Sequence, residues 1–510
     1  MADTPESLKA AANALFKGTR LSVFSRHVPR SEVRSEDLSV CGFRPDRPPR
    51  PAEGKYAKAV VAYSRALEVS PENAVLLSNR AFAHLRLENY GSAIEDASNA
   101  IASDPEYIKA YYRRGAARYA LGHLAEALKD FKTVCRMHPQ DRDGRMKLKE
   151  CESALRKKRF EEAIAAPEEA IVKVSSTVDT SEMVVDSAYD GARLAEDKVI
   201  TKAFVEDMIA RFKNEKTIAS RYAFEILMQA KDVLEPLPSV VDVPVPNGAH
   251  FTVCGDVHGQ FFDLCNIFEL NGAPSATNPY LFNGDFVDRG SFSVEVILTL
   301  LAYKALDPAC VYLTRGNHET AAMNKMYGFD GEVRAKYSAK LADLFQEVFQ
   351  YLPLGAVLGE KVFVTHGGLF SRDGVTLDEL RALDRVREPP ESGLMCEMLW
   401  SDPGPLPGRH PSKRGVGVAF GADVTKRFLE DNGLELVVRS HEVKDEGFEV
   451  DHDGCLITVF SAPNYCDQMG NKGAFIRFES DMVPHFTSFE AVPHPPSRPM
   501  QYASNSFMFQ

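Results

Sequence analysis

The sequence lacks the features that mark several classes of protein. Its nine cysteines are scattered over 510 residues without a Cys-x-x-Cys pair, so neither a disulfide framework nor a zinc ribbon is indicated. No stretch approaches 18 uninterrupted apolar residues, and the N-terminus has no apolar segment beside a basic one. Both absences argue against a membrane-spanning or secreted protein. We therefore expect a protein of a reducing compartment, located in the cytoplasm.

An excess of positive charge is also missing. The chain has 60 Lys and Arg against 72 Asp and Glu, a net charge of −12, which is not the footprint of a nucleic-acid-binding protein. Any anionic partner must then meet a local basic patch. The short basic run at 155–159 leaves nuclear import open, although a solvated helix face explains it more simply. The length allows about three folded domains.

A 34-residue repeat is present in the N-terminal third. Pro71, Pro105 and Pro139 are spaced by 34 residues. The small or apolar residues that keep the same period are Ala59, Ala93 and Ala127, and Ala66, Ala100 and Val134. This spacing is typical of tetratricopeptide repeats, in which small residues let two antiparallel helices approach and a proline ends the second helix. We predict an all-α solenoid over residues 1–166, made of three repeats and a capping helix.

The first repeat is interrupted. Its first helix ends near Lys17 and its second resumes at Glu53, and removal of residues 18–52 restores the 34-residue spacing. The interrupting segment is rich in arginine and proline and contains no lysine. One explanation is a surface loop, whose closure entropy grows only slowly with length. The other, which we favour because the segment has no amphipathic period, is translation of an unspliced intron.

The rest of the chain divides by its pattern into three parts. Residues 167–195 have no strong periodicity and are predicted to be a linker, and residues 488–510 form a C-terminal tail. Between them, residues 196–487 alternate apolar strand runs with helices. This alternation predicts an α/β domain with polar motifs at the carboxyl ends of its strands, where such sheets bind ligands.

Metal-ligand residues follow five of the predicted strands. The motifs GDVHG, GDFVDRG and GNHE follow three successive strands, and THGG and RSHE follow two later ones. Right-handed crossovers bring the first three motifs to one sheet edge, and we expect the later two at the same edge. The ligand-type residues gathered there are Asp256, His258, Asp285, Asn317, His366 and His441. Two carboxylates, three imidazoles and an amide oxygen suit two metals such as Mn, Fe or Zn, bridged by one carboxylate.

These motifs, together with SAPNYCD, resemble the phosphoprotein phosphatase family of metal-dependent serine/threonine phosphatases over roughly residues 200–485. With its N-terminal repeats, the chain is similar to the branch of that family that carries such repeats, in its plant form. The resemblance implies a C-terminal α/β metallophosphatase domain with a β-sandwich core. It also implies hydrolysis of phosphoserine and phosphothreonine in protein substrates by direct attack of a hydroxide that bridges two metals.

The resemblance also implies a role for each site residue. Asp256, His258 and Asp285 would bind one metal, and Asp285, Asn317, His366 and His441 the other. His318, paired with Asp288, would donate a proton to the leaving alkoxide, which has a high pKa and needs one. The residues implied to hold the phosphate or line the site are Arg289, Asn317, Arg414 and Tyr465. Arginine suits this task because it can meet two phosphate oxygens at once.

The repeat module has a polar constellation of its own. The residues expected to face its concave groove are Lys9, Asn13, Asn79, Lys109 and Arg113. Three cations and two amides make a local anion site in an acidic protein. The pattern resembles the two-carboxylate clamp that holds the acidic C-terminus of the ninety-kilodalton heat-shock chaperone. The resemblance further implies that the module and the tail hold the phosphatase inactive until such a peptide binds.

Two other functions are compatible with parts of this pattern. One is a catalytically silent scaffold that binds a chaperone; the complete ligand set and the intact His318 argue against it. The other is a metallophosphoesterase that acts on non-protein substrates such as nucleotides or nucleic acid. The acidic balance of the chain argues against it.

Overall fold

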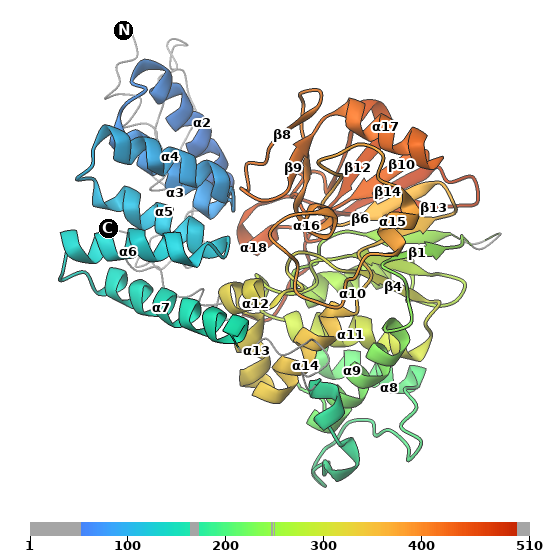
Figure 1. The fold of residues 1–510 in the computed structure, drawn as a ribbon. Helices are drawn as coiled ribbons and strands as arrows, with labels where there is room; N and C mark the ends of the chain where they lie inside the picture. The colour runs from blue at the N-terminus through green and yellow to red at the C-terminus, as the bar shows by residue number, and fades with distance from the viewer. Residues whose placement is uncertain (1–52, 164–172, 246–247, 249, 497–510) are drawn as a thin grey trace, which may run out of the picture. The chain divides into compact units, whose positions relative to one another are not determined.

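The computed structural model describes residues 53–163, 173–245, 248 and 250–496. The chain divides into two compact units, and the boundary between them falls within helix α7 (Arg142–Ala163). The first unit holds α2 to α6 and the start of α7, apart from the turn 120–124; the second holds that turn and everything after Leu148. Figure 1 labels the elements of both units.

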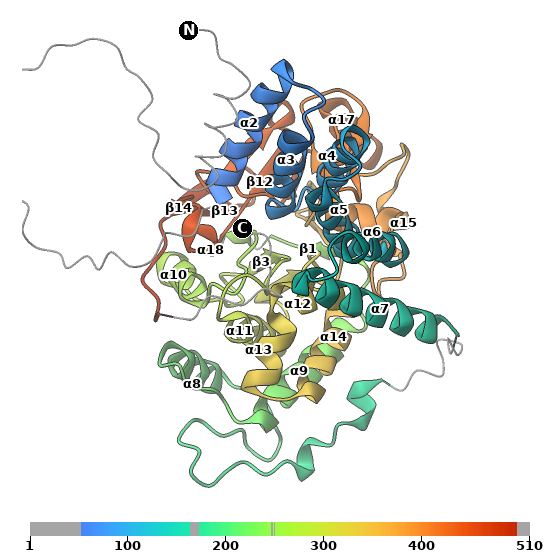
Figure 2. The ribbon, with the colours of Figure 1, turned by 90° about the vertical axis from the view of Figure 1, so that its left-hand side faces the viewer.

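The first unit is made of helices that follow the predicted repeats. They are α2 (Glu53–Val69), α3 (Ala74–Arg86), α4 (Tyr90–Ser103), α5 (Ile108–Ala120) and α6 (Leu124–Met137) (Figure 2). The six small or apolar positions that keep the 34-residue period have no exposed surface, so helices pack closely there. The predicted repeat solenoid is confirmed. The interrupting segment 18–52 lies outside the described residues.

A buried ion pair repeats with the same period. Arg80 on α3 contacts Asp96 on α4 at 2.7 Å, and Arg114 on α5 contacts Asp130 on α6 at 2.8 Å. Each arginine also donates to a serine sixteen residues earlier in the chain. Arg80 bonds Ser64 at 3.0 Å, and Arg114 bonds Ser98 at 3.2 Å. Both aspartates are almost fully buried, so their charges depend on these guanidinium groups.

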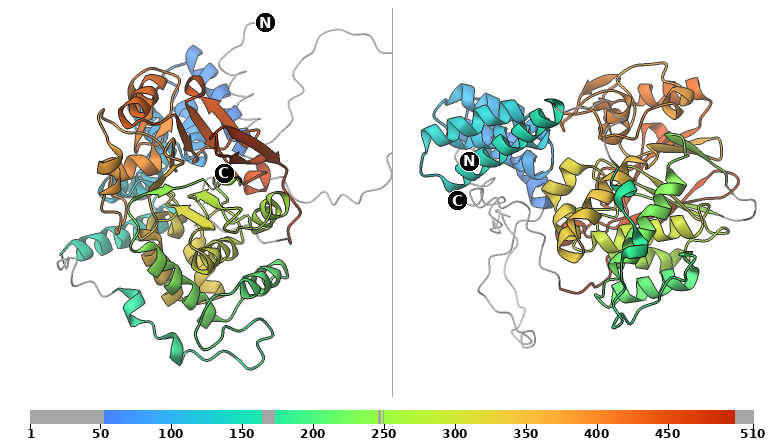
Figure 3. Two further views of the ribbon diagram at one scale, coloured as in Figure 1. Left: turned by 90° about the vertical axis from the view of Figure 1, so that its right-hand side faces the viewer. Right: turned by 60° about the horizontal axis from the view of Figure 1, so that its bottom comes forward.

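The second unit is built around two sheets packed face to face. In order, the six-stranded sheet contains β1 (Val240–Val243), β5 (Gly355–Leu358), β6 (Val362–Thr365), β10 (Leu436–Arg439), β12 (Leu456–Val459) and β11 (Phe448–Asp451). The five-stranded sheet contains β14 (Pro484–Phe489), β13 (Gly473–Phe478), β2 (Phe251–Cys254), β3 (Tyr280–Asn283) and β4 (Val311–Thr314). Val253 and Leu281 of one sheet share a core with Val364 and Val438 of the other. Figure 3 shows the ribbon from two further sides. The predicted β-sandwich core is confirmed.

Helices cover the outer face of each sheet. Those packed on the five-stranded sheet are α8 (Lys202–Lys213), α9 (Ser220–Leu234), α10 (Phe261–Asn271), α11 (Ser293–Leu306), α13 (Phe329–Lys336) and α14 (Ala339–Gln350). Those on the six-stranded sheet are α12 (Ala321–Tyr327), α15 (Leu377–Arg381), α16 (Leu394–Trp400) and α17 (Ala422–Asn432). Both faces of the central strands are therefore buried, as in β2, β3, β6 and β10, which explains their apolar runs. None of the described helices combines the length and apolar character needed to cross a membrane.

Small elements complete the second unit. A three-stranded sheet contains β7 (Asp402–Pro403), β9 (Val418–Phe420) and β8 (Arg409–Pro411), and the short helix α18 (Tyr465–Gln468) follows β12. Part of the expected linker also packs on this unit. In the 3₁₀ helix η2 (Val174–Thr177), Ser175 donates from its backbone N–H to the carboxylate of Glu347 on α14 at 3.0 Å. η3 (Thr180–Glu182) follows.

Candidate metal centre

Five strand ends bring the predicted ligands together. β2, β3 and β4 are parallel neighbours, so the loops that carry Asp256, Asp285 and Asn317 lie side by side. β6 and β10 are also parallel neighbours and carry His366 and His441. These two strands belong to the other sheet, so the expectation of one shared sheet edge is wrong. The ligands meet because the edges of two stacked sheets converge.

Asp285 lies at the centre of the cluster. Its Oδ2 is 3.4 Å from His258 Nε2 and 3.4 Å from His366 Nε2. Asp285 belongs to both groups of possible ligands, one with His258 and His318 and one with His366 and His441, and within each group the ligand atoms lie within 4.8 Å of one another. This is the position that a carboxylate bridging two cations must take.

Asp256 and Asn317 complete the set. Asp256 Oδ2 lies 3.7 Å from His258 Nε2, and its Oδ1 accepts the backbone N–H of His441 at 3.1 Å. Asn317 Oδ1 lies 2.8 Å from His366 Nε2 and faces acceptor atoms. Lone pairs that point at one another without a proton between them are stabilised by a cation, so this amide fits a metal site.

The imidazoles are oriented and uncharged, as metal ligands must be. The Nδ1–H of His258 donates to the carbonyl of Val287 at 2.9 Å, and that of His366 donates to the carbonyl of Asn283 at 2.9 Å. Each ring therefore presents its Nε2 lone pair to the cluster. Burial lowers the pKa of His258 well below its usual value, which keeps the ring neutral.

The carboxylates need positive charge. Burial raises the pKa of Asp256 to about 7 and that of Asp285 well above its usual value. Cations reverse such shifts, because an adjacent positive charge favours the ionised carboxylate. The mixed nitrogen and oxygen donors fit mid-series divalent metals. The residues present therefore fit a two-metal centre.

The backbone is strained where the site residues stand. His258, Asp285, Asp288, Arg289 and His441 have φ angles of 39°, 49°, 69°, 70° and 69°. Residues other than glycine rarely adopt this left-handed region, and such strain persists where the surrounding structure over-determines it, often at functional sites. The loops also pack too closely for side chains: a Cβ on Gly316 would lie 2.3 Å from the backbone nitrogen of Asp285.

Glu319 holds this strained loop and was missed by the sequence analysis. Its carboxylate accepts the backbone N–H groups of Asp285, Phe286 and Gly316, each at 2.8 Å. It is fully buried and thus ties the β3 loop to the β4 loop. Glu319 could have been identified from the sequence, because its carboxylate directly follows His318 in the GNHE motif.

His318 and Asp288 form a buried pair beside the ligands. His318 Nδ1 lies 2.9 Å from Asp288 Oδ2, and the His318 ring lies 4.8 Å from the ring of His258. Burial raises the pKa of Asp288 to about 7 and, with Arg289 nearby, lowers the pKa of His318 well below its usual value. Because Asp288 engages Nδ1, Nε2 is the ring nitrogen that can contact a bound substrate.

Arg414 is buried beside the ligand His441. Its Nε donates to Asp402 Oδ2 at 2.6 Å, and its terminal nitrogen donates to the carbonyl of His441 at 2.8 Å. Asp402 also accepts from Arg439 at 2.8 Å. Asp402 thus orients Arg414 from twelve residues away. Arg414 was expected at the site only through the family resemblance, and no motif in the sequence indicated Asp402.

Arg289 and Tyr465 lie around the same cluster. The guanidinium carbon of Arg289 is 4.1 Å from the ring centroid of Tyr327, and the Tyr327 ring lies 5.2 Å from that of His318. The Tyr465 ring lies 5.1 Å from that of His258. Each of these residues therefore contacts the ligands or the His318 pair, directly or through one aromatic ring.

In the repeat module, the described part of the predicted groove is polar and ordered by hydrogen bonds. Arg113 on α5 is 8% exposed and donates to Ser78 Oγ at 2.8 Å and to Asn79 Oδ1 at 3.2 Å. Burial lowers the pKa of Arg113 to about 10. Lys109 lies one turn earlier on α5 and is half-buried. Lys9 and Asn13 lie outside the described residues.

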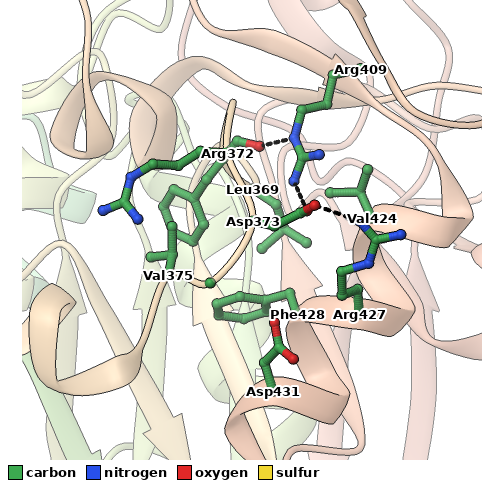
Figure 4. A pocket seen from close by; sticks show the side chains of 11 residues that line it. Leu369, Arg372, Asp373, Val375, Arg409, Val424, Arg427, Phe428 and Asp431 are labelled. Carbon is green, nitrogen blue, oxygen red and sulfur yellow. Dashed lines mark hydrogen bonds and ion pairs between the residues drawn. The ribbon is translucent and has the colours of Figure 1, made fainter.

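A separate small pocket contains none of the predicted site residues. It lies between the loop 369–375 and α17, and Figure 4 shows Arg409 and Arg427 directed at Asp373 over apolar side chains. Arg409 bonds Asp373 at 2.6 Å and the carbonyl of Phe370 at 2.6 Å. The Arg409 contacts hold the loop against β8, and the bond from Arg427 to Asp373 holds it against α17, which gives the pocket a structural role.

Comparison with known families and proteins agrees with this architecture. Residues 249–445 match the calcineurin-like phosphoesterase family, and residues 148–242 match the PPP5 TPR repeat region. Tetratricopeptide repeat families match 52–88 and 79–142. A solved structure described as a protein serine/threonine phosphatase from Saccharomyces cerevisiae with similarity to human phosphatase PP5 is 40% identical. It covers 59% of this chain and 100% of its own, with a TM-score of 0.57.

Similar proteins extend over both units. Serine/threonine-protein phosphatase 5 of Arabidopsis thaliana is 56% identical over 506 aligned residues, which cover 88% of this chain and 94% of that protein. Serine/threonine-protein phosphatase 5 of Homo sapiens is 53% identical over 450 residues, which cover 88% and 90%. Because identity above one half extends over nearly the whole length of these relatives, the chain belongs to the serine/threonine-protein phosphatase 5 family.

Proposed function

We propose that the protein removes phosphate from phosphoserine and phosphothreonine in other proteins, with the cluster around Asp285 as its metal centre and His318 as proton donor. The observation that carries the proposal is that the buried His318–Asp288 pair adjoins the converging ligands, with His318 and His258 rings 4.8 Å apart. Membership of a phosphatase family supports the substrate class.

The two groups of ligand-type residues that share Asp285 support a division of the ligands between two cations. Asp256 and His258 would hold one cation, His366, His441 and Asn317 the other, and Asp285 both. Two bound cations supply the positive charge that neutralises phosphate oxygens and activates water for attack on phosphorus. The mixed nitrogen and oxygen donors suit Mn, Fe or Zn as the two metals.

The remaining residues bind phosphate and deliver a proton. Arg289 and Arg414 would contribute guanidinium donors to the phosphate. Arg414 would do so through one terminal nitrogen, because its Nε and the other terminal nitrogen bond Asp402 and the His441 carbonyl. Arg414 is oriented for this by Asp402 at 2.6 Å. In its doubly protonated form, with Nδ1–H engaged by Asp288, His318 would give its Nε2 proton to the serine or threonine oxygen as the ester bond breaks, and would be left neutral. Tyr465 would line the pocket.

Activity on defined substrates tests this proposal. The purified full chain, loaded with Mn²⁺, should hydrolyse a phosphoserine peptide and leave a phosphodiester nearly untouched. Preference for the phosphodiester would favour the metallophosphoesterase with non-protein substrates. No hydrolysis of any ester by metal-loaded protein would favour the silent scaffold.

We further propose that the repeat module binds the acidic C-terminus of the ninety-kilodalton heat-shock chaperone. Lys109 and Arg113 stand one turn apart on α5, and Asn79 on α3 bonds Arg113 at 3.2 Å. Amide and guanidinium donors in this arrangement suit the carboxylates of a peptide end. Lys9 and Asn13 would complete the clamp.

Lys109→Ala should weaken binding of such a peptide by about ten- to a hundredfold, because it removes one charge-assisted hydrogen bond of about 1.5–3 kcal/mol. Arg113 is left unchanged in this test, because its bond to Ser78 orders the module itself. Titration calorimetry with the free-acid peptide measures the change. Lys132→Ala, at an exposed position of α6, is the charge-matched control. If Lys109→Ala and Lys132→Ala bind the peptide with equal affinity, Lys109 does not contact the peptide.

We also propose that the module and the tail restrain the phosphatase, and that the chaperone peptide releases it through its preference for the open state. The described end of the tail already lies near the site: the backbone N–H of Val492 donates to Asp263 at 2.9 Å, and His494 contacts Asp467 at 3.0 Å. Asp467 is two residues from Tyr465.

Deletion of residues 1–166 should raise phosphopeptide turnover about five-fold or more, the lower range of an ordinary coupling free energy. The measurement is kcat at equal metal content, with the acidic peptide added to the full chain as a parallel activator. The peptide should leave the truncated protein unaffected. Unchanged turnover after truncation would refute the restraint.

A further inference from the structure

One amide side chain touches both members of the His318–Asp288 pair. Asn324 on α12 donates from Nδ2 to Asp288 Oδ2 at 3.0 Å and to the backbone carbonyl of His318 at 2.6 Å. Its side chain is fully buried. We propose that Asn324 is a positioning residue that holds His318 and Asp288 in the geometry of proton transfer. The inference rests on the proposed role of His318 as proton donor.

The contacts of Asp288 leave its carboxylate no freedom to turn. Oδ1 accepts the backbone N–H of Phe329 at 2.9 Å, at the start of α13. Oδ2 accepts from His318 Nδ1 at 2.9 Å and from Asn324 at 3.0 Å. Without Asn324, Oδ2 keeps only its bond to the His318 ring, so the carboxylate and the imidazole can turn together about the fixed Oδ1. His318 would then lose both its aligned acceptor and the anchor on its carbonyl.

The orientation of the Asn324 amide is set from a third helix. Gln346 on α14 donates from Nε2 to Asn324 Oδ1 at 2.8 Å. This bond directs the two N–H groups of Asn324 toward Asp288 and His318. The reversed amide would place Oδ1 against the carboxylate of Asp288 and the carbonyl of His318, three acceptors facing one another. Gln346 therefore selects the productive orientation.

Small losses of alignment have large effects on proton transfer and attack. A displacement of about 1 Å at a reacting group can reduce a rate about a hundredfold. Asn324 touches neither the ligand atoms of the metal cluster nor, in the proposed mechanism, the phosphate. Its loss should then affect only the step that His318 performs, which distinguishes a positioning role from a general weakening of the fold.

The test measures kcat of the full-length, Mn²⁺-loaded protein on two substrates. A phosphoserine peptide needs a proton on its leaving group, and an aryl phosphate with an acidic phenol does not. Asn324→Ser and Asn324→Ala should lose about tenfold or more on the peptide and less than about threefold on the aryl phosphate. Asn324→Asp, of equal size but without a donor, should lose at least as much as Asn324→Ala. Equal losses on both substrates would overturn the inference.

A double-mutant cycle tests the route of the effect. If Asn324 acts only through His318, adding Asn324→Ala to His318→Asn should change peptide turnover by less than about twofold. A further tenfold loss would overturn the inference, while a selective effect of His318→Asn on the peptide would leave the proposed function intact. If His318→Asn alone affects both substrates equally, the proposed acid role fails, and Asn324 has no proton transfer to position.

Gln346 provides a variant that leaves Asn324 in place. Gln346→Glu replaces the donor by an acceptor, which should reverse the Asn324 amide and reproduce the selective loss on the peptide. Glu347→Gln, the neighbouring position on α14 whose carboxylate contacts Ser175 instead, is the matched control and should retain full turnover. Metal content and thermal unfolding are measured for every variant. A selective loss in Glu347→Gln as large as that in Gln346→Glu would also overturn the inference.

Discussion

Asp285→Asn is expected to lose both metals and to reduce phosphopeptide turnover by at least about a thousandfold, the effect of about 4 kcal/mol of lost charge stabilisation. Asp285 Oδ2 lies 3.4 Å from both His258 Nε2 and His366 Nε2. The asparagine puts an NH₂ group or a neutral oxygen at that point, and neither replaces a bridging carboxylate.

The fold should survive this substitution, because asparagine has the same shape and keeps an oxygen for the backbone N–H of His318, now bonded to Asp285 Oδ1 at 2.9 Å. Metal content by plasma mass spectrometry and kcat on a phosphoserine peptide are the measurements. Asp242→Asn makes the same change on an exposed side chain of β1 and should bind two metals. If Asp285→Asn still binds two metals at full occupancy, Asp285 does not bridge them.

His318→Asn should retain both metals and lose about a hundredfold or more in phosphopeptide turnover, the usual contribution of a general acid. The loss should shrink for aryl phosphates whose leaving groups depart without a proton. The structure makes the metal measurement essential, because His318 lies within the same group of ligand-type atoms as His258 and Asp285.

Two outcomes would contradict this role. Loss of one metal from His318→Asn would identify the residue as a ligand. Equal loss of turnover on phosphopeptide and aryl phosphate, with metals retained, would show that the imidazole serves binding or structure. Asp288→Asn provides a second test, because it leaves the imidazole in place and changes only its partner at 2.9 Å.

The strand ends could be predicted from the sequence because each ligand motif directly follows an apolar run, and the crossover rule places successive parallel strands together. The division of the ligands between two sheets could not. His366 and His441 follow strands of the same apparent type as the earlier ones, and nothing local states which sheet a strand will join. That choice depends on pairing between β6 and β10, which are distant in sequence.

The residues that orient others were the least predictable. Asp402 meets Arg414, and Asn324 meets Asp288, only after the chain has folded. Neither stands in a motif with a ligand. Glu319 was readable in principle, because it adjoins His318 in GNHE, but its three backbone partners belong to two loops. Single residues of this kind are specified by tertiary contacts.

The repeated arginine bridges also bear on how the helical module melts. Arg80 joins its own repeat, through Asp96, to the preceding one, through Ser64. Its ion pair with Asp96 stabilises its own repeat, and its bond to Ser64 adds to the interface with the preceding repeat, which a one-dimensional Ising description counts as nearest-neighbour coupling. Strong coupling with weak intrinsic stability makes neighbouring repeats unfold together. Loss of one arginine bridge would reduce the number of repeats that unfold together. The repeats between the lost bridge and the nearer end of the module would then unfold before the others.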